Sequence, residues 1–186
     1  MGATYLSMQL RTTDRAETIV ALRALTAAST DPSVQFYIAE SFGGWLPIYP
    51  SFTPELERTA KTLSARLKCL LVLLLSADED DLYCMFFRHG KQLPWFKIAA
   101  GRSRRGKERD KLATKLEALS EVCNAESRGR LVAALSDATE VTYSSDLLRT
   151  FCEITGIRNA FTSFDYLQRG EREGLEPDAA PTLVSV

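Results

Sequence analysis

The largest local excess of charge in the chain lies in a basic stretch between residues 97 and 111, where seven basic residues stand against two acidic ones. The candidate anion-binding residues in this stretch are Arg102, Arg104, Arg105, Lys107 and Arg109. Guanidinium groups and the backbone N–H groups of a Gly-containing loop are suited to binding phosphate. The aromatic residues Trp95 and Phe96, just upstream, could stack on bases. The stretch therefore predicts either a solvated loop, which could dock on an acidic turn, or a phosphate- or nucleic-acid-binding module that uses the basic loop 102–111.

Motif comparison weakens the nucleic-acid and nucleotide interpretations. Residues 101–107 resemble part of a P-loop, but Glu108 stands where Ser or Thr would hold Mg²⁺. The stretch also matches neither RNP1 nor the Gly-x-x-Gly loop of RNA-binding modules. The sequence thus disfavours nucleotide hydrolysis, and it favours nucleic acid less than a small anion as a partner.

A second charged cluster, Asp78, Glu79, Asp80 and Asp81, follows the most apolar segment of the chain. Carboxylates just beyond the end of a strand could hold a divalent metal, as a metal-dependent hydrolase would require. However, adjacent side chains point in different directions, and the cluster lacks the alternation and the glycine of a calcium loop. We interpret it mainly as a solvated turn that limits aggregation. The hydrolase stays as an alternative, and no metal ligand is assigned.

Histidine and cysteine provide no catalytic constellation. The one histidine, His89, precedes Gly90 in a predicted turn, and no spacing assigns it a nucleophile or an orienting partner. No catalytic residue and no cofactor are therefore predicted. The cysteines form no Cys-x-x-Cys pair and lie within apolar-periodic segments, which predicts buried free thiols in a reducing cytoplasm. They are Cys69, Cys84, Cys123 and Cys152.

Three aromatic residues, Trp45, Tyr49 and Phe52, flank the end of a predicted strand. Aromatic side chains at this spacing could line a small-molecule pocket, so these three are the candidate ligand-binding residues. The alternative is ordinary packing in the core or at the edge of a sheet.

Hydrophobic periodicity predicts the elements that would position these residues. The first six follow the order βαββαβ, with strands over 3–10, 34–39, 45–49 and 69–75 and helices that begin near residues 14 and 54. This order is that of a ferredoxin-like split βαβ sheet. The apolar run at 69–75 does not alternate, which predicts a strand covered on both faces.

The next segment predicts a hairpin of residues 82–88 and 91–98 that extends the sheet, with Pro94 on the new edge. Pro47 falls in a strand that this topology makes internal, so it predicts either a bulge or another strand order. The fold class is thus α+β: a sheet domain over 1–98, a C-terminal helical part over 107–170 packed on it, and a flexible tail over 171–186.

Two segments carry a family resemblance. The first is Gly44-Trp45-x-x-x-Tyr49-Pro50, followed by a helix containing Leu63-Ser64 and an apolar strand with an acidic turn. The second is Gly156-Ile157-x-Asn159-Ala160-x-x-Ser163-Phe164-x-Tyr166-Leu167. On these segments the chain resembles a family of small, functionally uncharacterised bacterial proteins. The resemblance implies a bacterial cytoplasmic protein and provides no catalytic residue.

Composition sets the remaining bounds. The chain has 186 residues, 45% of them hydrophobic and 25% charged, with a net charge of −1. This composition excludes a disordered chain, a disulfide-rich miniprotein and a uniformly basic nucleic-acid binder. The apolar run at 69–75 is far shorter than the roughly 20 residues of a membrane-spanning helix, so no membrane partner is predicted. We predict a non-enzymatic binding, sensor or interaction domain, whose partner could be another protein or a small anionic ligand.

Overall fold

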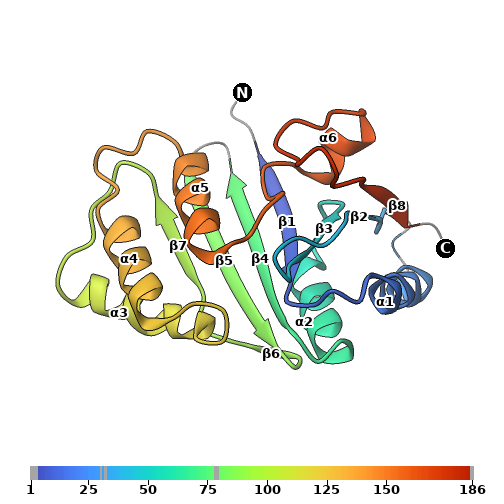
Figure 1. Ribbon diagram of the computed structural model, residues 1–186, viewed down its shortest axis with the longest axis horizontal. Helices are drawn as coiled ribbons and strands as arrows, with labels where there is room; N and C mark the ends of the chain where they lie inside the picture. The colour runs from blue at the N-terminus through green and yellow to red at the C-terminus, as the bar shows by residue number, and fades with distance from the viewer. Residues whose placement is uncertain (1–3, 30, 32, 78–79, 185–186) are drawn as a thin grey trace.

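The computed structural model describes residues 4–29, 31, 33–77 and 80–184 and has an α+β fold (Figure 1). Its strands are β1 (Tyr5–Leu10), β2 (Phe36–Ile38), β3 (Leu46–Pro50), β4 (Leu70–Ala77), β5 (Asp81–Arg88), β6 (Lys91–Gln92), β7 (Phe96–Ala99) and β8 (Thr182–Val184). Its helices are α1 (Arg15–Ala28), α2 (Leu56–Arg66), α3 (Lys107–Leu116), the 3₁₀ helix η1 (Glu117–Leu119), α4 (Ala125–Ser136), α5 (Ser144–Thr155) and α6 (Phe164–Gln168).

The strands form one antiparallel sheet in the order β6-β5-β4-β1-β3-β2-β8, with β7 also paired to β5. The inner order β4-β1-β3-β2, with α1 and α2 as crossovers, is the ferredoxin-like arrangement. The predicted fold class is therefore confirmed. The hairpin extension makes β4 interior, between β1 and β5.

The two prolines take positions that disturb the ladder little. Pro47 lies in β3, and its carbonyl accepts a hydrogen bond from the Ala39 N–H at 3.1 Å. Both backbone polar groups of an antiparallel residue face the same neighbour, so the missing N–H of Pro47 faces Ala39, just past the end of β2. The strand order is thus retained without a bulge. Pro94 separates β6 from β7, so the single edge strand predicted over 91–98 is two short strands.

Alternating side chains give the sheet two cores. The even-numbered residues of β1 and the odd-numbered residues of β4 pack under α1 and α2; they include Leu6, Met8, Leu71 and Leu73. The opposite face of β4, with β5 and β7, packs under α3, α4 and α5 through residues such as Leu74, Phe86 and Phe151. The predicted coverage of β4 on both faces is confirmed. Figure 1 shows α3, α4 and α5 over the β5–β7 end of the sheet.

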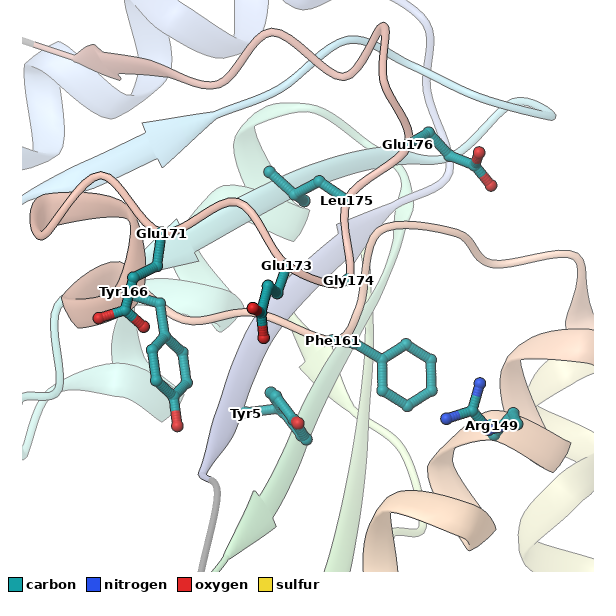
Figure 2. Close-up of a pocket in the computed structure, with 9 residues that line it drawn as sticks. All are labelled: Tyr5, Arg149, Phe161, Tyr166, Glu171, Glu173, Gly174, Leu175 and Glu176. Carbon is teal, nitrogen blue, oxygen red and sulfur yellow. The ribbon is translucent and has the colours of Figure 1, made fainter.

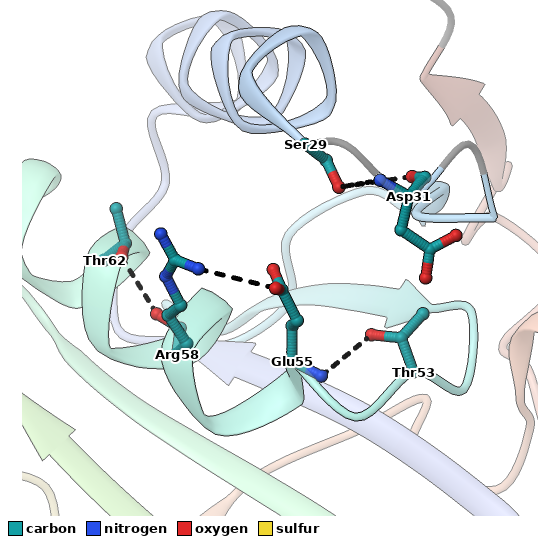
Figure 3. Close-up of polar contacts among 6 residues, drawn as sticks. All are labelled: Ser29, Asp31, Thr53, Glu55, Arg58 and Thr62. Carbon is teal, nitrogen blue, oxygen red and sulfur yellow. Dashed lines mark hydrogen bonds and ion pairs between the residues drawn. The ribbon is translucent and has the colours of Figure 1, made fainter.

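Local signals set most helix ends. Asp14 accepts a hydrogen bond from the Glu17 N–H at 2.8 Å and caps α1, as predicted. The second helix starts later than predicted, because Thr53 accepts from the Glu55 N–H within a turn and α2 begins at Leu56. Figure 3 shows this turn and the Glu55–Arg58 ion pair that follows it. Gly156 adopts a left-handed conformation and ends α5.

The C-terminal segment is more ordered than a loose tail. Residues 182–184 form β8, which pairs with β2 and extends the sheet on its far side. Ala179 is buried, and its carbonyl accepts from the Glu40 N–H at 2.7 Å. A short strand thus lies within the segment over 171–186 for which the sequence predicts a flexible tail. Within the described parts of the chain, the helices are too short or too polar to cross a membrane.

Candidate functional site

The structure does not bring Trp45, Tyr49 and Phe52 around one cavity. Trp45 is buried, and its Nε1 donates to the Thr155 carbonyl at the end of α5 at 3.2 Å. Tyr49 is fully buried, and its hydroxyl donates to the Asn159 carbonyl at 2.6 Å. Burial raises the pKa of Tyr49 well above its usual range. Both residues therefore anchor the C-terminal part of the chain to the sheet.

Phe52 differs from Trp45 and Tyr49 because its side chain is exposed. Its side chain is 70% exposed, just beyond the end of β3. It borders a hollow of about 580 Å³ between the sheet and α6, together with Pro50, Leu75 and Phe164. Of the three candidate aromatics, Phe52 is thus the one placed beside an open surface.

The basic stretch is partly neutralised within itself. Arg102 pairs with Glu108 at 3.7 Å, and Lys107 is exposed at the first position of α3. Arg104 is half-buried and donates to the Lys97 carbonyl at 3.2 Å, and burial lowers its pKa.

Three of the candidate arginines meet at one place. Arg104, Arg105 and Arg109 border a hollow of about 270 Å³, with Asp137 on the same rim. The clustering of these arginines in the sequence indicates an anion site, but Asp137 places an opposing carboxylate beside them. Binding of an anion there stays a prediction.

The acidic turn lies only partly within the described residues, since Asp78 and Glu79 fall outside them. The backbone of Asp80 accepts from the Ala100 N–H at 2.9 Å. The Asp81 carboxylate pairs with Lys97 at 2.7 Å, and this hydrogen bond raises the pKa of Lys97. The basic stretch thus docks on this turn through Lys97. The described part of the chain contains no cluster of three or more His, Cys, Asp or Glu side chains placed to hold a metal.

His89 and the cysteines occupy structural positions. His89 and Gly90, both with positive φ, form the two-residue turn of the β5–β6 hairpin, and the Gly90 N–H donates to Ser64 Oγ at 2.9 Å. The four cysteines are free and buried, as predicted. Burial raises the pKa of Cys69 to about 11, which disfavours the reactive thiolate at neutral pH.

The pocket with the most distinctive lining involves none of the predicted site residues. It has a volume of about 550 Å³ and lies between the start of β1, α5, α6 and the segment after α6 (Figure 2). Three aromatic rings line it. Tyr5 lies edge-on to Phe161 with ring centroids 5.7 Å apart, and its centroid is 6.2 Å from that of Tyr166. We call this cavity, with its aromatic lining, the aromatic pocket.

Charged residues surround the aromatic pocket. Glu171 pairs with Arg169 at 2.6 Å, which lowers the pKa of Glu171. Glu176 pairs with Arg158, also at 2.6 Å. The other two charged residues of the lining are Glu173 and Arg149, and neither has an ion-pair partner among the described residues. The lining therefore contains one carboxylate and one guanidinium that form no ion pair with another described residue.

The wall formed by residues 171–176 is held at several points. Asn159 Oδ1 accepts from the Glu176 N–H at 2.7 Å, while its carbonyl accepts from Tyr49. Gly174 has a φ of +79° and lies so close to Phe161 that a Cβ would overlap that residue's backbone. Tyr49, predicted to touch ligand, thus positions the pocket wall through Asn159.

The sequence alone could not reveal this pocket. Tyr5 and Phe161 are far apart in the chain, and residues 171–176 have no periodicity that would indicate a fixed wall. The available signal was the recurrence of Glu at positions 171, 173 and 176, shortly after Tyr166.

Comparison of the chain with family models, curated proteins and solved structures finds no match. The resemblance to uncharacterised bacterial proteins therefore stays a prediction, and the pocket must be interpreted from its own geometry.

Proposed function

We propose that this protein is a non-enzymatic domain that binds a small organic molecule in the aromatic pocket. The observation that carries the proposal is the cavity of about 550 Å³ with Tyr5, Phe161 and Tyr166 in its lining. Cavities of roughly 300–1,000 Å³ with aromatic walls and a few polar groups are typical of small-molecule sites.

The lining favours recognition over catalysis. Its polar side chains are three glutamates, one arginine and two tyrosines, and two of the glutamates are engaged in ion pairs. Covalent catalysis would require a nucleophile beside a base that activates it, and this set of side chains does not suggest such a pair. Rings and fixed charges can instead hold a ligand and orient it.

The proposal is tested by thermal unfolding of the full chain with a panel of amines, amino acids, carboxylates and nucleosides. A ligand at a hundredfold excess over its Kd stabilises the folded state by about 2.7 kcal/mol, which raises Tm measurably. Tyr166→Ala should remove this shift, because it removes one wall of the pocket. Tyr143→Ala is the matched control, since Tyr143 is 48% exposed and lies outside the lining. Absence of any shift across the panel, or an unchanged shift in folded Tyr166→Ala, would contradict the proposed function.

A further inference from the structure

We propose that the ligand of the aromatic pocket is a zwitterion, with an ammonium or alkylammonium group at one end and a carboxylate at the other. This inference rests on the proposed function and adds the chemical class of the ligand. It is carried by the two charges of the lining that lack an ion-pair partner among the described residues, Glu173 and Arg149.

The cationic end of the ligand has a site beside Glu173. Figure 2 shows the Glu173 carboxylate directed toward the side of the pocket where the Tyr5 and Tyr166 rings lie. The centroids of these two rings are 6.2 Å apart, and the guanidinium of Arg169 lies 5.0 Å from the centroid of the Tyr166 ring, so one face of that ring is already occupied. Aromatic faces attract ammonium groups through the ring quadrupole, and alkylated ammonium groups gain most because they are weakly hydrated. A carboxylate next to such rings adds direct charge complementarity.

The anionic end of the ligand has a site at Arg149. This residue extends from α5, and its guanidinium carbon lies 5.0 Å from the centroid of the Phe161 ring. Stacking on the ring leaves the N–H groups at the edge of the guanidinium available to donate, and their geometry matches the two oxygens of a carboxylate.

The arrangement of the two charges favours a ligand that carries both signs. Glu173 and Arg149 do not pair with each other, and Figure 2 shows the Phe161 ring between the Glu173 side and Arg149. A purely cationic ligand would leave Arg149 without an anion, and a purely anionic ligand would leave Glu173 without a cation. A zwitterion satisfies both groups at once.

The other two glutamates of the lining are already in ion pairs, which leaves Glu173 and Arg149 for a ligand. Glu171 and Glu176, also in the lining, are held at 2.6 Å by Arg169 and Arg158. A ligand cation placed in the pocket would have to compete with those arginines for either glutamate. Glu173 needs no such exchange, so it is the carboxylate to which we assign the ammonium group.

The test is calorimetric titration of the full chain with a series of trimethylammonio carboxylates of increasing length. Tetramethylammonium chloride and sodium acetate serve as comparison probes, because each carries only one of the two charged groups. We expect the best zwitterion to bind at least about tenfold more tightly than either single-charge probe, because it gains both interactions. The chain length that binds best would report the spacing of the two charges.

Two variants separate the ends of the ligand. Glu173→Gln should weaken binding of the zwitterion and of tetramethylammonium by about tenfold and leave acetate binding unchanged. Arg149→Gln should instead weaken binding of the zwitterion and of acetate. Glu57→Gln and Arg130→Gln are matched controls at exposed positions outside the lining, and both should bind as the parent does.

The outcomes distinguish this inference from the proposed function. If neutral or singly charged compounds of the wider panel bind in a Tyr166-dependent manner and zwitterions show no preference, the zwitterion assignment is wrong and the binding function stands. Zwitterion binding that is indifferent to both Glu173→Gln and Arg149→Gln would also overturn the assignment. If no compound of either set binds, the proposed function itself fails.

Discussion

Gly174 holds the wall of the aromatic pocket against Phe161. Its φ of +79° belongs to the left-handed region, and a Cβ at this position would overlap the carbonyl oxygen and Cβ of Phe161. A side chain here would therefore meet both backbone strain and steric overlap. A single residue without a side chain thus allows the segment after α6 to approach the loop after α5.

We predict that Gly174→Ala lowers the free energy of unfolding by about 3 kcal/mol and abolishes ligand binding, because strain and overlap together displace residues 171–176. Urea denaturation measures the first effect and calorimetry the second. Gly170→Ala is the control: Gly170 has a similar φ of +80°, but a Cβ there meets nothing within 4 Å. Gly170→Ala should lower the free energy of unfolding by only about 1–2 kcal/mol and leave the pocket intact. Equal effects of the two substitutions would show that the contact with Phe161 is unimportant.

Residue-level prediction from the sequence succeeded where the signal was local. Asp14 and Gly156 are recognisable because capping depends on neighbours within one helical turn. The structural role of Tyr49 cannot be predicted from the sequence, because its partner Asn159 is brought to it only by the tertiary fold. The same reason hides the contact between Tyr5 and Phe161.

At the scale of elements, β4 joins the two cores. Leu71 faces α1 and α2, and Leu74 faces the α3–α5 side, and both side chains are at most 1% exposed. The lack of alternation in this strand made the arrangement predictable, since a strand with one solvated face would alternate. The helical part was less predictable: the stripe that includes Leu116 and Leu119 continues from α3 into η1, and α and 3₁₀ turns share similar apolar spacing.

We predict that Leu71→Ala and Leu74→Ala each lower the free energy of unfolding by about 2–5 kcal/mol, because each leaves a cavity in a different core. Chemical denaturation of the two variants, compared with the parent, measures both effects. Leu183→Ala serves as the reference, since Leu183 is 44% exposed on β8 and should change stability by less than about 1 kcal/mol. A small effect of either core substitution would contradict the coverage of β4 on both faces.

At the scale of the whole molecule, the C-terminal segment closes the far edge of the sheet. It runs from α6 past the aromatic pocket, through buried Ala179, to β8 beside β2. Val184 is 7% exposed and belongs to the same core as Leu22 and Phe36. Sequence patterns could not predict this closure, because a three-residue strand is too short to show a period and the segment before it is rich in Gly, Pro and Glu.

The net charge of −1 also has a spatial explanation. The basic stretch docks on the acidic turn through Lys97 and Asp81, and the acidic segment after α6 meets Arg158 and Arg169. These contacts neutralise part of the charge seen along the sequence. Glu173 and Arg149 form no ion pair among the described residues, and because both also line the aromatic pocket we assign them to a ligand.

Truncation after residue 180 tests the closure of the sheet. Removal of residues 181–186 deletes β8, so β2 becomes an edge strand and the core around Phe36 loses Val184. We expect the free energy of unfolding to fall by about 2–4 kcal/mol, and we expect self-association to increase because an unpaired strand edge is exposed. Denaturation at several protein concentrations, with light scattering, measures both effects. Since residues 171–176 and Ala179 are retained, ligand binding at low temperature should persist. A truncated chain as stable and monomeric as the parent would show that β8 contributes nothing to the fold, and the segment would then be the loose tail that its composition suggests.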